Sequence, residues 1–208
     1  MEVAAQKKSQ HAAEQDREDV ARARQLWRET QSGLNVKRLV FIDETGAQTN
    51  MTRRYGRAPR GERLVAKVPW GHWKTITFVS ALRCDRLTAP AVFDGPIDGD
   101  GFLAYVEQVL APTLEPGDTV VMDNLSSHKV AGIREAIEAT GASLRYLPPY
   151  SPDFNPIEQA IAKLKSHLRK HSARTFGTLI EAIATTLPTF TAQECANFFA
   201  NAGYRHQL

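Results

Sequence analysis

The chain has 208 residues, 42% of them hydrophobic and 24% charged, which is enough to bury the core of one medium-sized domain. No apolar run approaches the length of a membrane span, and the first residues lack the apolar core of a signal peptide. Cys84 and Cys195 lie far apart without metal-ligand spacing. We therefore expect a soluble cytoplasmic protein with free thiols and no membrane partner.

The net charge of +3 is unevenly distributed. Residues 51–75 contain seven basic residues and one acidic residue, and residues 159–208 contain six basic and two acidic residues. Residues 76–118, between these segments, contain two basic and seven acidic residues. Two basic segments on either side of an acidic one suit a polyanionic partner, although a solvated surface is the ordinary explanation for a charge run.

The chain divides into a polar segment, 1–36, and a domain, 37–208. Residues 19–29 have a helical pattern with Val20, Ala23 and Trp27 on one side, typical of a linker helix or of an arm packing on the main body. The segment is too short to hold a helix-turn-helix module.

Three strands are expected first in the domain, at 38–43, 74–83 and 87–93, as an antiparallel meander. The loop 44–61 between the first two is rich in arginine and glycine. Helices and strands then alternate: a helix capped by Asp100, a strand at 119–123, a helix carrying Ile133 and Ile137, a strand at 144–147, and helices after Pro156, near 178–187 and at 191–201. This order predicts an α/β fold with a mixed five-stranded sheet flanked by helices, the three antiparallel strands being extended by parallel ones.

Glu158 lies in the opening turn of the helix after Pro156, which has an apolar stripe of Ile157, Ile161, Leu164 and Leu168. Asn155 and Glu158 have the spacing of a capping box, which would make Glu158 structural. Taken alone, that explanation would be preferred. Two further acids favour a functional role.

Asp43 and Asp123 each end a hydrophobic strand, where open α/β sheets carry their functional crevice. If the strands are neighbours, the two carboxylates repel by roughly 4 kcal/mol at about 4 Å and an effective dielectric near 20. A divalent cation removes this repulsion, and Mg²⁺ prefers such oxygen ligands. Two ions roughly 3.5–4 Å apart serve phosphodiester chemistry. The sequence has no P-loop, nucleophile elbow or zinc-ligand cluster to suggest another chemistry.

Three blocks, FIDETG at 41–46, MDNLSSH at 122–128 and YSPDFNPIE at 150–158, resemble the catalytic blocks of mariner-type DDE transposases, most closely those of the bacterial insertion-sequence branch. Asp123 and Glu158 are 158 − 123 = 35 positions apart, so thirty-four residues intervene, as that family's pattern requires. The resemblance implies an RNase H-like fold with Asp43, Asp123 and Glu158 as catalytic, metal-binding residues, and two Mg²⁺ or Mn²⁺ ions. It also implies cleavage at transposon ends, strand transfer into target DNA, a homodimer and a bacterial cytoplasmic location on the nucleoid.

Such transposases carry an N-terminal helix-turn-helix region, and residues 7–35 resemble the segment that follows it. The chain is therefore expected to be the second product of a split reading frame, with a separately encoded helix-turn-helix partner, or a truncated copy. Another RNase H-like nuclease and a fragment that only binds DNA or full-length subunits stay open as alternatives.

Supporting residues each have two explanations. Asn124 could contact a phosphate or a metal-bound water, or form an Asx turn. His128 could touch a phosphate or a metal ligand, although a surface histidine is slightly favoured. Glu44 should point to the opposite face from Asp43 and be structural.

Several basic side chains are candidate DNA contacts, because backbone phosphates attract such clusters. They are Arg53, Arg54, Arg57, Arg60 and Arg63 on the loop, and Lys163 and Lys165, with Arg169 and Lys170, on the helix of Glu158. A solvated surface is the alternative for both groups. Trp70 and Trp73 are expected to pack in the core or at a sheet edge.

Overall fold

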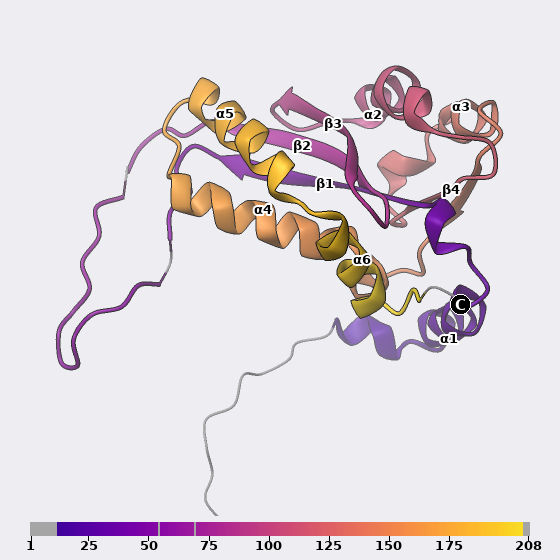
Figure 1. Ribbon diagram of the computed structural model, residues 1–208, viewed down its shortest axis with the longest axis horizontal. Coiled ribbons are helices and arrows are strands. Elements are labelled where there is room, and N and C mark those ends of the chain that lie inside the picture. Colours follow the sequence, from indigo (N-terminus) through magenta and orange to yellow (C-terminus); the bar gives the residue numbers. More distant parts are fainter. Residues whose placement is uncertain (1–11, 54, 69, 206–208) are drawn as a thin grey trace, which may run out of the picture.

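The computed structural model describes residues 12–53, 55–68 and 70–205 (Figure 1). Its described residues form one sheet in the order β3-β2-β1-β4-β5. The strands are β1 (Leu39–Gln48), β2 (Thr75–Leu82), β3 (Leu87–Asp94), β4 (Thr119–Met122) and β5 (Ser143–Tyr146). β1, β2 and β3 are antiparallel, whereas β4 is parallel to β1 and β5 is parallel to β4. The predicted mixed five-stranded sheet is confirmed.

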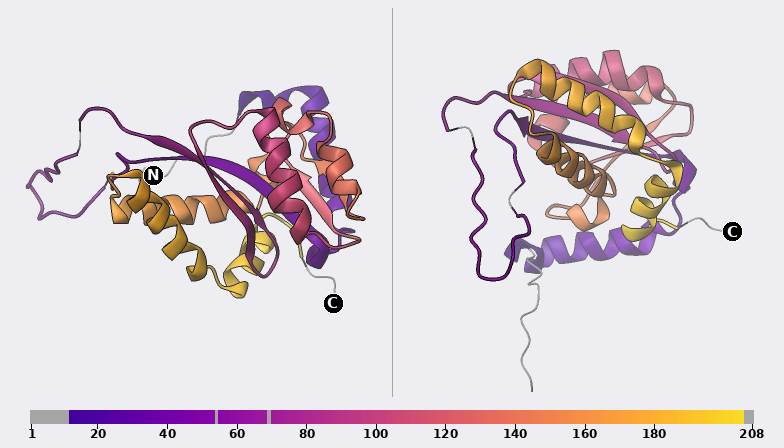
Figure 2. Two further views of the ribbon diagram at one scale, coloured as in Figure 1. Left: turned by 90° about the horizontal axis from the view of Figure 1, so that it is seen from above. Right: turned by 60° about the vertical axis from the view of Figure 1, so that its left-hand side comes forward.

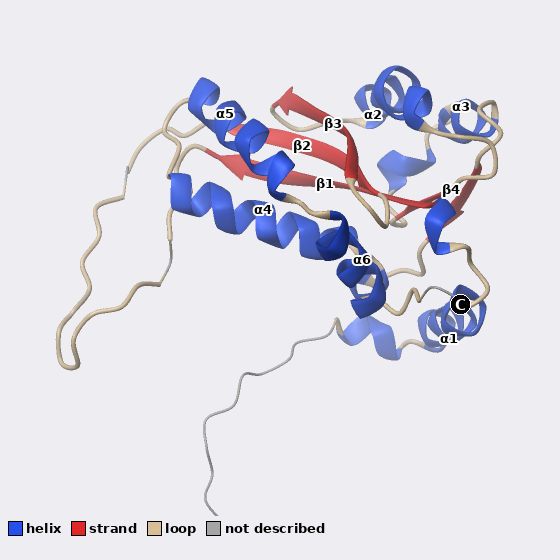
Figure 3. Cartoon of the chain, in the orientation of Figure 1, coloured by secondary structure: helices blue, strands red, loops and turns tan. Residues whose placement is uncertain are grey.

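Helices cover both faces of this sheet (Figure 3). They are α1 (Glu18–Gln31), α2 (Gly99–Tyr105), α3 (Ile133–Glu138), α4 (Ile157–His171), α5 (Phe176–Thr186) and α6 (Ala192–Asn201). Asp98, not the expected Asp100, caps α2, because its side chain accepts from the Gly101 N–H. The expected capping box of Thr191 and Glu194 begins α6.

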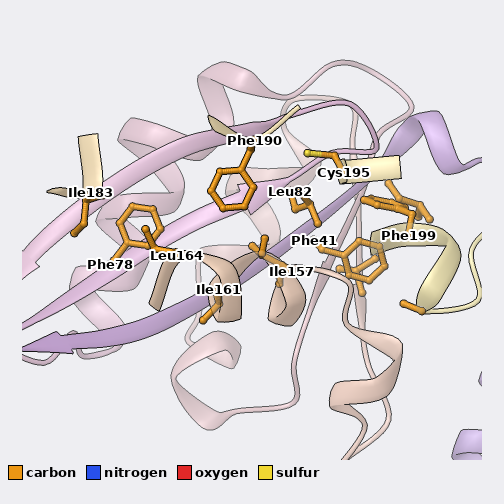
Figure 4. Close-up of a cluster of buried hydrophobic side chains, with 14 of the residues drawn as sticks. Phe41, Phe78, Leu82, Ile157, Ile161, Leu164, Ile183, Phe190, Cys195 and Phe199 are labelled. Atoms are coloured by element: carbon orange, nitrogen blue, oxygen red, sulfur yellow. The ribbon is translucent and has the colours of Figure 1, made fainter. Parts of the chain in front are cut away.

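Two apolar cores hold the layers together. On one face, α4, α5 and α6 pack on the sheet around Phe41, Leu164 and Phe199 (Figure 4). The four apolar positions predicted for α4 are all buried. On the opposite face, α2 and α3 cover Ile42 and Met122. Side chains of β1 therefore alternate between the two cores, with Phe41 toward α4 and Ile42 toward α2.

Helix α1 packs on the main body, which is one of the two alternatives that its pattern allowed. Val20 and Trp27 are buried, and the Trp27 indole N–H donates to the Tyr204 hydroxyl at 3.0 Å. Figure 1 shows α1 below α6 and the end of α4.

The first strand is longer than expected. β1 continues to Gln48 because residues 41–48 pair with β2, so Asp43 lies in mid-strand instead of at a strand end. Its pairing with β4, however, covers only residues 39–41. Asp43 thus lies just beyond the last residue of β1 that pairs with β4. On the side that faces β4, its position is that of a residue at a strand end.

The connection between β1 and β2 projects from the sheet (Figure 2). Trp70 is 100% exposed and Trp73 53%, so the expectation that they pack in the core or at a sheet edge is wrong. β2 begins only at Thr75, and the described residues from 53 to 74 of the connection before it are all exposed.

Within the described residues, no helix combines the length and apolarity needed to cross a membrane. Both cysteines, Cys84 and Cys195, are free thiols.

Candidate active site

The register of two parallel strands brings the first two acids together. Leu39 pairs with Thr119 and Phe41 with Val121, a constant offset of 80 residues. Asp43 and Asp123 each lie two residues beyond the last of these pairs, with the same offset. Glu158 reaches the same place from the first turn of α4, and the three acids line one cavity of about 460 Å³. The segment from Leu147 to Pro152 forms another wall.

Asp43 is held at both carboxylate oxygens. Oδ1 accepts from the Glu44 backbone N–H at 2.8 Å, and Oδ2 accepts from the Asn155 side-chain amide at 3.1 Å. Burial raises the pKa of Asp43 to about 7, and the negative charges of Glu158 and Asp123 add to the rise. The carboxyl group of Asp43 is therefore harder to ionise here than in water, mainly because it is buried.

Asn155 does not cap α4 as expected. Pro156 takes the position before the helix and no side chain caps it, because the Asn155 amide turns toward Asp43. Its Oδ1 is buried and has no hydrogen-bond partner among the described residues. Since the amide serves Asp43, the capping box no longer explains Glu158.

Asp123 is oriented by its own loop and by His128. Asp123 Oδ1 accepts from the Leu125 backbone N–H at 3.1 Å, and Nδ1 of His128 lies 2.7 Å from the same oxygen, in an ion-pair contact whose angle departs from hydrogen-bond geometry. The other ring nitrogen lies 3.0 Å from Oε2 of Glu44. The expectation of a surface histidine is wrong: His128 is 0% exposed and its ring stacks on Phe102 at 4.3 Å.

His128 and Glu44 form a buried link on the α2 side of the sheet. Burial alone would lower the pKa of His128, but the carboxylates of Asp123 and Glu44 raise it to about 9, so the ring is a cation at neutral pH. Glu44 lies on the opposite face from Asp43, as strand alternation predicted, and its partner is this imidazolium.

Glu158 is the most accessible of the three acids. Desolvation raises its pKa, the positive charge of Lys165 opposes that rise, and the charge of Asp123 adds to it. Asn124 is exposed and lines the cavity. The hydrogen bond typical of an Asx turn is made here by Asp123, whose Oδ1 accepts from the Leu125 N–H.

The donor set suits a hard cation. The three carboxylates line one cavity, and the buried amide oxygen of Asn155 beside them has no hydrogen-bond partner among the described residues; hard divalent cations prefer oxygen donors of this kind. In the part of the chain that the structure describes, no three His, Cys, Asp or Glu side chains are yet gathered at ligand distance.

The basic residues fall into two groups. Arg53, Arg57, Arg60 and Arg63 are exposed on the β1–β2 connection, and Arg54 lies outside the described residues. On α4, Lys163 is engaged within the protein, since its ammonium pairs with Glu194 at 2.8 Å and lies over the Phe190 ring.

Lys165 instead lines a groove of about 390 Å³ between the end of β1 and α4, together with Arg169. No acid is among the described residues that line this groove. Glu158, Lys165 and Arg169 follow one helical face, because they are spaced by seven and four residues.

Sequence reasoning missed two contacts made over long separations. Asn155 reaches Asp43 across 112 positions, and Arg24 on α1 reaches Asp153 across 129. Neither residue has a local pattern that distinguishes it, so only the fold reveals its partner.

Asp43 and Asp123 thus come from the region of two neighbouring parallel strands and Glu158 from a following helix, and the three acids line one cavity. A family profile described as DDE superfamily endonuclease matches residues 38–180. The chain belongs to this family.

Solved structures agree with the fold. The chain is similar to Mos1 transposase in its paired-end complex with the left transposon end, with a TM-score of 0.75 and 13% identity over 97% of this chain and 64% of that one. The Mos1 mariner paired-end complex with Mn matches with a TM-score of 0.73 and 11% identity, over 97% of this chain and 63% of that one. The catalytic domain of Mos1 mariner transposase matches with a TM-score of 0.65 and 11% identity, over 93% of this chain and 91% of that one.

The chain thus spans less than two thirds of the Mos1 chains in the paired-end complexes, but nearly all of the Mos1 catalytic domain. At such low identity the likeness establishes the RNase H-like fold. No match was found among curated protein sequences.

Proposed function

We propose that the chain is the catalytic domain of a mariner-superfamily transposase of the bacterial insertion-sequence branch. It would cleave DNA at transposon ends and join the new 3′-OH to target DNA. The observation that carries the proposal is the cavity shared by Asp43, Asp123 and Glu158. Two neighbouring strands and a helix supply these acids, and no simpler structural need explains the buried charge of Asp43.

In this proposal Asp43, Asp123 and Glu158 would hold Mg²⁺ or Mn²⁺, as two ions. When bound, such ions stabilise the charge on the attacking and leaving oxygens of phosphodiester exchange. The protein's own groups prepare the acids. His128 and the Leu125 N–H fix one oxygen of Asp123 and leave the other free to face a ligand. Asn155 holds Asp43 through its side-chain amide.

The DNA backbone is proposed to follow the basic face of α4. Lys165 and Arg169 lie seven and eleven residues beyond Glu158, about 10 and 16 Å along the axis at roughly 1.5 Å per residue. Asn124 at the cavity wall is proposed to contact the scissile phosphate. The loop arginines Arg53, Arg54, Arg57, Arg60 and Arg63 would bind flanking phosphates. A contact from Lys163 would require it to leave Glu194.

Pairing of two transposon ends requires a homodimer in this account. Recognition of the end sequence would come from a helix-turn-helix region, on this or on another polypeptide. The protein would act in the bacterial cytoplasm, on the nucleoid.

The test uses purified protein, a labelled duplex oligonucleotide with a recessed 3′-OH, supercoiled plasmid, and Mg²⁺ or Mn²⁺. Transfer of the label into the plasmid, lost in Asp123→Asn, is the expected result. Nicking without joining would favour another RNase H-like nuclease. DNA binding with neither product, even when a helix-turn-helix partner is added, would favour a binding fragment and overturn the enzymatic proposal.

A further inference from the structure

The wall of the cavity that residues 147–152 form is fastened to α1 by the side chain of Arg24. Arg24 is 6% exposed, and its guanidinium donates to both carboxylate oxygens of Asp153 at 2.8 Å, to Ser151 Oγ at 2.8 Å and to the Tyr150 carbonyl oxygen at 3.3 Å. A planar guanidinium supplies this fork of donors, which a lysine does not. Arg24 therefore donates hydrogen bonds to Tyr150, Ser151 and Asp153, which belong to the segment that leads to Glu158.

The segment needs such fastening because its backbone is strained. Tyr150 has φ of 54°, in the left-handed region that a bulky side chain rarely adopts. Its carbonyl oxygen accepts from Arg24 and also from the Gln15 side-chain amide at 2.7 Å. Conformations of this kind persist only where neighbouring contacts hold them.

Apolar and aromatic contacts complete the attachment. The Arg24 guanidinium lies 4.7 Å from the centroid of the Phe154 ring. Trp27, one helical turn further along α1, donates to the Tyr204 hydroxyl, which donates in turn to the Phe154 carbonyl oxygen at 2.8 Å. The chain between Tyr150 and Phe154 is thus held by Arg24 of α1 directly, and at the Phe154 carbonyl by Trp27 through Tyr204.

The residues that the segment delivers are those of the site. Asn155, next in the chain after Phe154, reaches Asp43, and Glu158 follows in the first turn of α4. We propose that Arg24 is a positioning residue of the active site, which sets Asn155 and Glu158 through residues 150–154. This inference rests on the proposed function for its catalytic consequence. It also makes α1, which lies before the family match at residues 38–180, a working part of the site.

The experiment compares Arg24→Met and Arg24→Lys with Arg28→Met as the matched control. Arg28 lies on the same helix and its guanidinium lies 5.4 Å from the centroid of the Phe154 ring, but within the described residues it donates no hydrogen bond to residues 150–154. Because the Asp153 side chain is 45% exposed, its carboxylate becomes hydrated in Arg24→Met, and the variant should still fold.

Three readouts are needed: amide hydrogen exchange of residues 148–158, the dissociation constant for Mn²⁺ without DNA, and kcat and KM for plasmid cleavage. Arg24→Met should speed exchange in that segment alone and weaken Mn²⁺ binding about tenfold or more, since hydrogen bonds to a charged group contribute factors of roughly ten to a hundred. It should lower kcat while KM for DNA stays unchanged. In all three measurements Arg24→Lys should give values between those of wild type and Arg24→Met, and Arg28→Met should match wild type.

Unchanged exchange and Mn²⁺ affinity in Arg24→Met would overturn the inference, as would a lowered melting temperature with normal Mn²⁺ affinity in the folded protein. If wild type fails to cleave DNA, the proposed function fails. Exchange of the segment still decides whether Arg24 holds it.

Discussion

Replacing Asp43 by asparagine should stabilise the metal-free fold at alkaline pH while abolishing activity. The pKa of Asp43 rises from 3.8 to about 7 through burial and the charges of Glu158 and Asp123. A carboxyl whose pKa is higher in the folded than in the unfolded state contributes stability that is complete below pH 3.8 and is lost as the pH rises through 7. At about 1.4 kcal/mol per pKa unit, wild type loses about 2–4 kcal/mol across this window, the lower figure allowing for solvent at the cavity mouth.

Asparagine does not ionise, and the Asn155 amide can turn over to serve it. The free energy of unfolding of Asp43→Asn minus that of wild type should therefore grow by about 2–4 kcal/mol between pH 4 and pH 8. Urea unfolding in EDTA at both pH values measures this difference. Asp85→Asn is the control, because that exposed acid pairs only with Arg86 in the described structure. An equal difference at both pH values would refute the reasoning.

Three further results are expected. His128→Phe keeps the stacked ring but loses both nitrogens, so the rate of DNA cleavage should fall roughly tenfold or more. Against the effect of burial, the carboxylates raise the pKa of His128 from 6.5 to about 9. The stability that this gives wild type over the variant should be present below pH 6.5 and lost as the pH rises through 9, which urea unfolding of both proteins would measure. Lys165→Ala with Arg169→Ala should reduce the salt slope of duplex DNA binding by about 2, whereas Lys37→Ala should leave it unchanged, and equal slopes would exclude the α4 face. Leu164→Ala, at a position 2% exposed, should lower the free energy of unfolding by about 2–5 kcal/mol in urea titration, and a smaller change would mean that the α4 core is loosely packed.

The sequence predicts those parts of the fold whose signal is local and periodic. The apolar spacing of Ile157, Ile161, Leu164 and Leu168 defines the buried face of α4, and the sheet order follows from the succession of strands and helices. β1 was predicted too short because residues 44–48 lack a hydrophobic alternation, and their pairing with β2 makes them a strand.

Contacts between distant residues account for the errors at the site. Asn155 fits a helix cap by spacing, yet a buried carboxylate on β1 offers its amide a stronger partner. His128 resembles a surface histidine until β1 and β4 bring Glu44 and Asp123 to its two nitrogens. Arg24 lies in a polar helix, and only the fold sets it against the segment before Glu158.

Anomalous diffraction from crystals soaked in MnCl₂ would locate the ions on which the proposed chemistry depends. We expect an anomalous peak within about 2–2.5 Å of carboxylate oxygens of Asp43 and Asp123, with Glu158 turned toward it. Mn²⁺ bound only elsewhere on the chain, with water alone between the three acids, would contradict the proposed active site.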